Sequence, residues 1–172
     1  MTGPFRLLAA LRVDIPVLLV GGGAVGTRKA RTLRDAGAPV DLVSPEATEE
    51  LAALATAGRL RWTRREVEPE DFRTHRYAVL ALDEATTRRI LPLTEGSGCL
   101  LCCCALPEAG HFALAAQGRH GDFVLGAASG GSDPGGAAAL KRRLLHLLQP
   151  QDDKDLRAPA REERHHEKER TP

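Results

Sequence analysis

The chain has no excess of charge of one sign. Its 24 Lys and Arg residues oppose 23 Asp and Glu residues, which leaves a formal net charge of +1. This balance argues against the large basic face of a nucleic-acid-binding protein. We therefore expect a small molecule, and no nucleic acid, as the partner.

Long apolar runs are also missing. The segment 1–20 carries Arg6, Arg12 and Asp14 among its apolar side chains, which interrupt the apolar core that a signal peptide requires. No later run reaches the length that spans a membrane. These absences predict a cytoplasmic protein that does not insert into a membrane.

The cysteines lack the spacing of a disulfide framework. All four fall within the segment 99–104, and Cys102, Cys103 and Cys104 are consecutive, so most pairings among them are geometrically awkward. None of the six histidines stands at a zinc-finger-like distance from them, and we predict no metal site. A metal or redox role remains the alternative. We interpret Leu100–Ala105 as a buried strand in which cysteine acts as a small hydrophobic residue.

What the sequence does contain is a glycine-rich turn between a strand and a helix. Val17–Val20 predicts the strand, and Val25–Ala36 predicts the helix, which Gly37 ends. The connecting run is Gly21, Gly22, Gly23, Ala24, Val25 and Gly26. This spacing provides a tight turn, a backbone that a pyrophosphate can approach, and close packing of the helix. A purely structural turn is the alternative, but the strand-turn-helix context favours dinucleotide binding.

Strands and helices continue to alternate after this unit. In chain order we expect a strand at Val40–Val43 that Pro45 closes, a helix at Ala47–Ala57, an exposed strand at Leu60–Arg65, a buried strand at Tyr77–Leu82, a helix at Glu84–Leu93 and the cysteine strand. The alternation predicts an α/β fold of the Rossmann type, with a mostly parallel sheet, over residues 1–110.

The pattern changes after Pro107. Phe112–Gln117 and Phe123–Ala128 predict two strands joined by a turn over 118–122. Ala137–Leu148 predicts a helix with Pro134 in its first turn. Ser132 or Asp133 is expected to cap this helix.

The strand-strand-helix unit, residues 111–150, is too small to stand alone. It packs either on the Rossmann unit or on a second subunit, because exposed strand edges invite pairing. We favour a homodimer in which this unit is the dimerisation segment. From Gln151 onward, seven acidic and six basic residues stand almost without apolar ones, so residues 151–172 are predicted to form a charged, disordered tail.

The choice between NAD and NADP depends on the end of the second strand. Val43, Ser44 and Pro45 lack the acidic residue that binds both ribose hydroxyls. Ser44 can bond a ribose hydroxyl, whereas Arg28 and Arg65 could meet a 2′-phosphate. We favour NAD as the cofactor. Further cofactor-binding candidates are Ser44, Pro45, Glu46 and, at the end of the third strand, Leu82.

Two segments resemble one known family. Val17–Ala30, with its three glycines followed by Arg28-Lys29, is similar to the opening of the precorrin-2 dehydrogenase/sirohydrochlorin ferrochelatase family, the N-terminal module of siroheme synthase. Ala127–Pro134 is similar to that family's Ser-Gly-Gly loop before a helix, and the resemblance covers about Pro4–Leu148. It implies a homodimer with intertwined strands and NAD-dependent oxidation of precorrin-2 to sirohydrochlorin, in siroheme or cobalamin biosynthesis.

The resemblance also implies a substrate-binding loop at Ser129, Gly130 and Gly131. Its hydroxyl and backbone donors precede a helix, where they would suit the carboxylates of a tetrapyrrole. A role in the turn and the helix cap is the alternative. Near the nicotinamide side the chain departs from the family, because Leu82-Asp83 replaces a Thr-Asp pair and Thr87 replaces an asparagine.

The family's proton-accepting aspartate aligns with Ala105, shortly before Pro107. A methyl group cannot accept a proton, so we expect the chelatase activity to be lost. Hydride transfer could survive through positioning, with solvent taking the proton. Glu108 and His111 are the candidate substitute bases. The alternatives are a non-catalytic family member that binds dinucleotide or tetrapyrrole, and a different Rossmann oxidoreductase.

Overall fold

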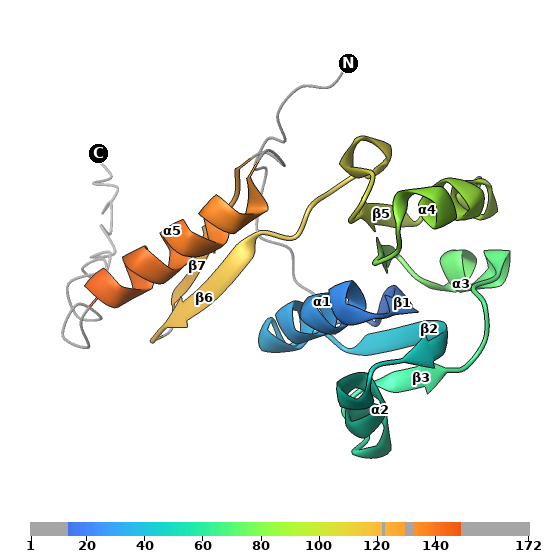
Figure 1. Ribbon diagram of the computed structural model, residues 1–172, viewed down its shortest axis with the longest axis horizontal. Coiled ribbons are helices and arrows are strands. Elements are labelled where there is room, and N and C mark those ends of the chain that lie inside the picture. The colour runs from blue at the N-terminus through green and yellow to red at the C-terminus, as the bar shows by residue number, and fades with distance from the viewer. Residues whose placement is uncertain (1–13, 122, 130–132, 149–172) are drawn as a thin grey trace, which may run out of the picture.

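The computed structural model describes residues 14–121, 123–129 and 133–148 (Figure 1). Its main body is a five-stranded parallel sheet with the order β3-β2-β1-β4-β5. The strands are β1 (Val17–Gly22), β2 (Val40–Ala47), β3 (Arg61–Thr63), β4 (Tyr77–Leu80) and β5 (Leu100–Cys103). The connecting helices are α1 (Ala24–Asp35), α2 (Glu49–Thr56), α3 (Pro69–Thr74) and α4 (Glu84–Ile90), the last continued by a 3-10 turn, η1 (Leu91–Thr94). This is the expected α/β architecture.

Side chains along each strand alternate between the two faces of the sheet, and helices cover both faces. In β1, Val17 and Leu19 pack with Leu33 of α1 in one core cluster, whereas Leu18 and Val20 pack with Phe72 of α3 in the other. All four β1 side chains are almost completely buried. A parallel strand covered on both faces is a continuous apolar run, which is the pattern that predicted it.

The cysteines are divided between these two clusters. Cys102 packs on the α1 face, and Cys99 and Cys103 pack on the α3 and α4 face. The prediction of a strand with buried cysteines is confirmed for residues 101–103, whereas Leu100 is exposed and the strand ends two residues before Ala105. Within the described ranges, no three His, Cys, Asp or Glu side chains are grouped closely enough to hold a metal ion.

The second strand continues past the point where Pro45 was expected to end it, so that expectation is wrong. β2 runs to Ala47, which pairs with Gly22 across a shift in register between Val20 and Gly22. Pro45 has no N–H to give to the ladder, and beside it the Gly22 N–H donates to the Ser44 hydroxyl at 3.0 Å, so β1 and β2 stay joined at this point. Ala47 therefore belongs to the strand, and α2 begins two residues later than expected.

α3 was not predicted from the sequence. This helix starts at Pro69, and Glu68 and Asp71 form a reciprocal capping box around its first turn. Both features are helix-start signals that are visible in the sequence. The helix has only six residues, which is too short to show an apolar period.

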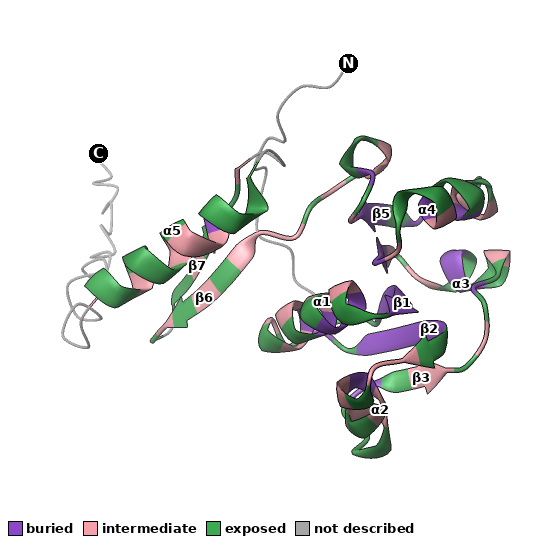
Figure 2. Cartoon of the chain, viewed as in Figure 1, coloured by how far each residue is buried: buried purple, intermediate pink, exposed green. Residues whose placement is uncertain are grey.

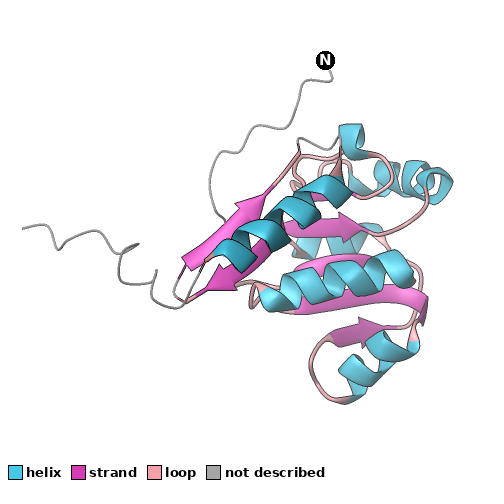
Figure 3. Cartoon of the chain, turned by 60° about the vertical axis from the view of Figure 1, so that its left-hand side comes forward, coloured by secondary structure: helices cyan, strands magenta, loops and turns pink. Residues whose placement is uncertain are grey.

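A smaller unit follows the sheet. Its antiparallel strands are β6 (Ala116–His120) and β7 (Phe123–Ala127), and α5 (Pro134–Leu147) packs against both (Figures 1 and 3). Asp133 caps α5 by accepting a hydrogen bond from the Gly136 N–H at 2.8 Å, as expected. Ser132 and the charged tail lie outside the described residues.

The first strand of this unit begins four residues later than predicted, at Ala116 instead of Phe112. Gly118 was assigned to the turn, but it lies inside β6, and His120 pairs with Phe123. Gly118 is a glycine for a tertiary reason: a Cβ there would lie 2.3 Å from Leu145 Cδ1 of α5. Phe112, assigned to the strand, instead packs against the sheet, with its ring edge-to-face on Tyr77 at 6.1 Å.

Candidate functional site

The glycine turn connects β1 to α1 under close steric constraint. Gly21 has a φ of +103°, and a Cβ there would lie 2.7 Å from the carbonyl oxygen of Ala81. A Cβ at Gly26 would lie 2.0 Å from the Gly21 carbonyl oxygen. The first and last glycines therefore allow the tight turn and the close packing of α1 on β1.

Gly23, between them, leaves open space. No atom lies within 4 Å of the position that its Cβ would take, and Gly23 is the N-cap residue of α1. No side chain caps the helix, and its first turn carries no acidic residue. The backbone N–H groups and the positive end of the helix dipole thus meet an accessible surface, which fits the pyrophosphate of a dinucleotide.

The position of the turn in the sheet supports the same use. β1 is flanked by β2 on one side and by β4 on the other. The chain leaves β2 toward α2 on one face of the sheet, and it leaves β4 toward α4 on the opposite face. Open α/β sheets bind ligands at this reversal, outside the carboxyl ends of the strands. Leu82 follows the carboxyl end of β4, and its Cδ2 would lie 2.9 Å from a Cβ on Gly21. The structure therefore brings Leu82 to the edge of the turn.

The residues at the end of β2 differ in what they present. Ser44 is buried, and its hydroxyl oxygen already accepts the Gly22 N–H, while its carbonyl accepts the indole N–H of Trp62 at 2.9 Å. Ser44 therefore holds the turn in place. Pro45 and Glu46 are exposed beside it. Of these residues, Glu46 is the one that offers an accessible carboxylate.

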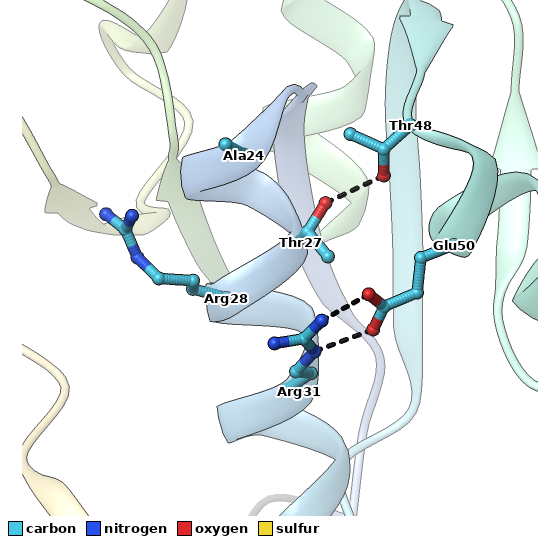
Figure 4. Close-up of a pocket in the computed structure, with 6 residues that line it drawn as sticks. All are labelled: Ala24, Thr27, Arg28, Arg31, Thr48 and Glu50. Atoms are coloured by element: carbon cyan, nitrogen blue, oxygen red, sulfur yellow. Dashed lines mark hydrogen bonds and ion pairs between the residues drawn. The ribbon is translucent and has the colours of Figure 1, made fainter.

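A surface cavity of about 310 Å³ lies between the first turns of α1 and α2 (Figure 4). Thr27 Oγ1 and Thr48 Oγ1 lie 2.8 Å apart and join the two helices. Arg31 Nε donates to Glu50 Oε1 at 2.6 Å, and this hydrogen bond lowers the pKa of Glu50. Arg28 points away from the other labelled side chains. Apart from Ala24 and Arg28, the sequence analysis singled out none of these residues, since only the packing of α2 on α1 brings them together.

Arg65, a candidate for a 2′-phosphate, is engaged elsewhere. Its guanidinium donates to both Asp71 carboxylate oxygens, at 2.7 and 2.8 Å. Burial alone would raise the pKa of Asp71, but the hydrogen bonds from Arg65 and from the Glu68 N–H outweigh it and lower that pKa. A bidentate pair of this kind leaves little of the guanidinium for a ligand.

After β5 the chain leaves the sheet at the carboxyl edge, and Ala105 stands there at the position of the family's aspartate. Ala105 follows β5 and is exposed, and Glu108 is exposed in a 3-10 turn, η2 (Pro107–Ala109). The charge of Glu108 contributes to the raised pKa of Cys103, which places its carboxylate near the end of β5. Of the two substitute bases, Glu108 stays at the edge that holds the glycine turn.

His111 lies farther from that edge. Its backbone N–H donates to the Leu101 carbonyl oxygen at 2.7 Å, and its ring Nδ1 accepts the Leu101 backbone N–H at 3.1 Å. Leu101 is the second residue of β5, so the chain has turned back beside the strand. The ring therefore closes the outer edge of the sheet, with one nitrogen already occupied.

A thiol pair lies on the α1 face of β5. The hydrogen bond from the Cys104 thiol lowers the pKa of Cys102 to about 7 against the effect of burial, and the ammonium of Lys29 lowers it further. Burial raises the pKa of Cys99 and of Cys103 to about 11. The same hydrogen bond and burial raise the pKa of Cys104, so the α1 face holds one thiol of lowered and one of raised pKa.

Asp83 and Ser129 both serve helix starts. Asp83 Oδ1 accepts the Thr86 N–H at 2.9 Å and caps α4, and Thr87 is fully buried beneath that cap. Ser129 Oγ accepts the Asp133 N–H at 2.8 Å before α5. Gly130 and Gly131 lie outside the described residues, so the loop as a substrate site stays a prediction.

Comparison with known proteins identifies the main body. Residues 11–116 match the model of a family described as NAD(P)-binding. The chain belongs to this NAD(P)-binding family. It is also 38% identical over 138 residues to siroheme synthase 1 of Aeromonas salmonicida, a match that covers 77% of this chain and 29% of that protein. The chain spans less than a third of the siroheme synthases it matches.

Two precorrin-2 dehydrogenases are similar over most of their own length. The enzyme of Bacillus subtilis is 25% identical over 132 residues, covering 77% of this chain and 82% of that protein. The solved structure of SirC, precorrin-2 dehydrogenase, superposes with a TM-score of 0.67 at 21% identity, over 87% of this chain and 74% of that one. The family resemblance inferred from the two sequence segments is confirmed, and so is the fold. No helix in the described part of the chain is long and apolar enough to cross a membrane.

Proposed function

We propose that this chain oxidises precorrin-2 to sirohydrochlorin with NAD, in the biosynthesis of siroheme or cobalamin. One observation carries the proposal: an uncapped helix N-terminus behind a glycine turn, at the point where the strand order reverses. It occurs in a chain related to siroheme synthases and to a precorrin-2 dehydrogenase. When bound, the nicotinamide accepts the hydride.

NAD is favoured over NADP by the charges at the end of β2. Glu46 is exposed there, where its carboxylate would repel a 2′-phosphate and accept a hydrogen bond from a ribose hydroxyl. Arg65, which could have offered a positive charge, is held by Asp71. This assignment predicts a clear preference for NAD in binding.

The chain's own residues act mainly by binding and orientation. The N–H groups at the start of α1 hold the pyrophosphate, and Leu82 gives an apolar contact beside the turn. At the family's acid position Ala105 can take no proton, so the proton leaves to solvent or to Glu108. The chelatase reaction lacks its proton acceptor, and we propose that this activity is absent.

The tetrapyrrole site would be completed by a second copy of the chain. The β6-β7-α5 unit leaves several large apolar side chains exposed: Phe123, Val124, Leu140, Leu144 and Leu147. Apolar area of this kind on a small unit marks an interaction surface, and a homodimer is the simplest closed assembly that covers it. The Ser129–Gly131 loop precedes α5 of this unit, so dimerisation would place it near the substrate.

The test is NADH formation from precorrin-2 under anaerobic conditions, with sirohydrochlorin measured in the same sample. Gly23→Asp places a carboxylate in the open space at the start of α1 without a steric clash, so it should abolish NAD binding and activity while the fold is retained. Gly23→Ala adds a methyl group without a charge, so the further loss in Gly23→Asp measures the effect of the carboxylate. Wild-type protein that binds NAD but forms no sirohydrochlorin above the uncatalysed rate would end the dehydrogenase proposal.

A second candidate function is supported by Ala105 itself. A family member without its proton acceptor would bind dinucleotide or tetrapyrrole without chemistry. Ala105 is exposed, so Ala105→Asp should fold normally. If the scaffold is competent, this variant should raise the dehydrogenase rate by about tenfold or more. An unchanged zero rate in both proteins, with tetrapyrrole binding retained, would favour the binding role.

A further inference from the structure

A larger cavity, about 890 Å³, lies at the edge of the sheet opposite the glycine turn. Its walls come from the segments that precede or begin the parallel strands. They are Pro16 before β1, Asp41 as the second residue of β2, Arg61 at the start of β3, Arg76 before β4 and Ser97 before β5. We call it the amino-edge cavity. The carboxyl edge carries the glycine turn, so the two sites are separated by the length of the strands.

The amino-edge cavity carries a surplus of positive charge. Arg61, Arg73 and Arg76 line it, and Asp41 is the one carboxylate among its lining residues. His75 lines it as well. A concave site with charges of one sign focuses its field and concentrates ligands of the opposite sign.

The carboxylate in this cavity is already neutralised. Asp41 Oδ2 lies 3.0 Å from His75 Nε2 and also pairs with Arg61. The side chains of Asp41 and His75 are only 11% and 10% exposed. A buried carboxylate with two cationic or donor partners exerts little repulsion on an incoming anion.

His75 is fixed from both sides. Its Nδ1 lies 2.7 Å from the Asp71 carbonyl oxygen, and its Nε2 faces the Asp41 carboxylate. Thr74 Oγ1 also lies 3.2 Å from Nδ1, so three polar contacts hold the imidazole at the wall of the cavity. Arg61 and His75 together engage Asp41, so Arg73 and Arg76 have no carboxylate partner among the residues that line the cavity.

Two of those arginines remain available to a ligand. Within the described ranges, the Arg76 guanidinium makes no hydrogen bond or ion pair. Arg73 Nη1 pairs only with Glu70, at 3.2 Å, and both side chains are well exposed. An exposed pair of this kind is weak and exchanges readily for a better partner. Guanidinium forks match the paired oxygens of phosphate and carboxylate groups.

We propose that the amino-edge cavity binds a small polyanion carrying two or more phosphate or carboxylate groups, held by Arg73 and Arg76 against the wall formed by His75 and Arg61. The site is independent of the dinucleotide and of the dehydrogenase reaction. It makes the amino edge of the sheet a second ligand site, at which a metabolite can bind while the cofactor is in place.

The experiment is calorimetric titration of the full chain with pyrophosphate and, separately, with citrate, both in saturating NAD so that the glycine turn cannot take the probe. We expect one anion bound per chain. The double variant Arg73→Gln/Arg76→Gln should weaken binding by at least about tenfold, because it removes two charge-assisted contacts. Arg89→Gln, at an exposed arginine of α4 outside the cavity, removes one charge by the same substitution and should stay within about twofold.

Preference for one probe identifies the anionic group, phosphate or carboxylate, and either preference supports the site if the variants separate as stated. The proposal is overturned if neither probe binds saturably, if NAD displaces the probe, or if Arg89→Gln weakens binding as much as the double variant. Melting temperatures of the variants should equal that of the wild type, since Arg73 and Arg76 are exposed. Dehydrogenase activity has no part in this readout.

Discussion

The five-stranded sheet and the β6-β7-α5 unit bury their apolar side chains to very different extents (Figure 2). In the sheet, Leu18, Leu19 and Phe72 are completely buried between helices of the same chain. In the smaller unit, Val124 is 57% and Leu147 is 72% exposed. Two strands and one helix have one shared face to bury, whereas a sheet covered on both sides has two. The sheet buries its apolar side chains within the chain, whereas the smaller unit leaves several of its own exposed, which is the basis of the proposed homodimer.

The largest expected effect tests the sheet side of this comparison. Phe72→Ala removes a fully buried ring and should lower the free energy of unfolding by about 3 to 5 kcal/mol. Val124→Ala, the matched change in the smaller unit, should cost less than about 0.5 kcal/mol. Urea unfolding at protein concentrations low enough to keep the chain monomeric measures both. Equal costs would show that the two regions are buried alike.

The next prediction tests the partner of the smaller unit. Val124→Asp and Leu147→Asp place charges on the apolar surface and should weaken dimerisation by about a hundredfold or more, since a buried unpaired charge costs several kcal/mol. Ala53→Asp, at an exposed position of α2, is the control and should leave the dimer intact. Sedimentation velocity over a range of concentrations gives the answer. A wild-type chain that remains monomeric at every concentration would remove the basis for the comparison.

A smaller effect is expected at the glycine turn, inside the sheet region. Gly26→Ala places a methyl 2.0 Å from the Gly21 carbonyl oxygen and should cost about 1 to 3 kcal/mol of stability, because α1 must move away from β1. NAD binding should weaken with it. Gly23→Ala meets no atom and should leave the stability nearly unchanged. Thermal unfolding with and without NAD separates the two glycines, and similar melting temperatures for both variants would contradict this account.

The smallest effect concerns pH and the buried thiols in and beside β5. Cys99 and Cys103 have pKa values raised by burial to about 11, so their contribution to stability is complete below about pH 9 and is lost as the pH rises through 11. Cys102 has a pKa lowered to about 7, so its contribution is complete above about pH 9 and is lost as the pH falls through 7. Stability should therefore decline between pH 9 and 11, and Cys99→Ala should make that decline shallower.

Local sequence determined much of this protein. The spacing Gly21-x-Gly23-x-x-Gly26, the apolar run of β1 and the alternation of strands and helices were sufficient to predict the Rossmann sheet and its phosphate turn. The cap of α5 was predicted as Ser132 or Asp133, and Asp133 takes this role. These features depend on residues a few positions apart, whose periodicity and backbone preferences act before any distant contact forms.

Only the tertiary structure decided the features that depend on distant segments. β2 passes Pro45 and pairs Ala47 with Gly22, whose N–H donates to Ser44, and Gly118 stands in β6 where α5 leaves no room for a side chain. Asp41 gains His75 as a partner, 34 positions away in the chain. Such contacts follow from which surfaces meet after the sheet has formed, and residue spacing carries no record of them. The sequence therefore predicted where a dinucleotide would bind, and the fold alone brought together the charges of the amino-edge cavity.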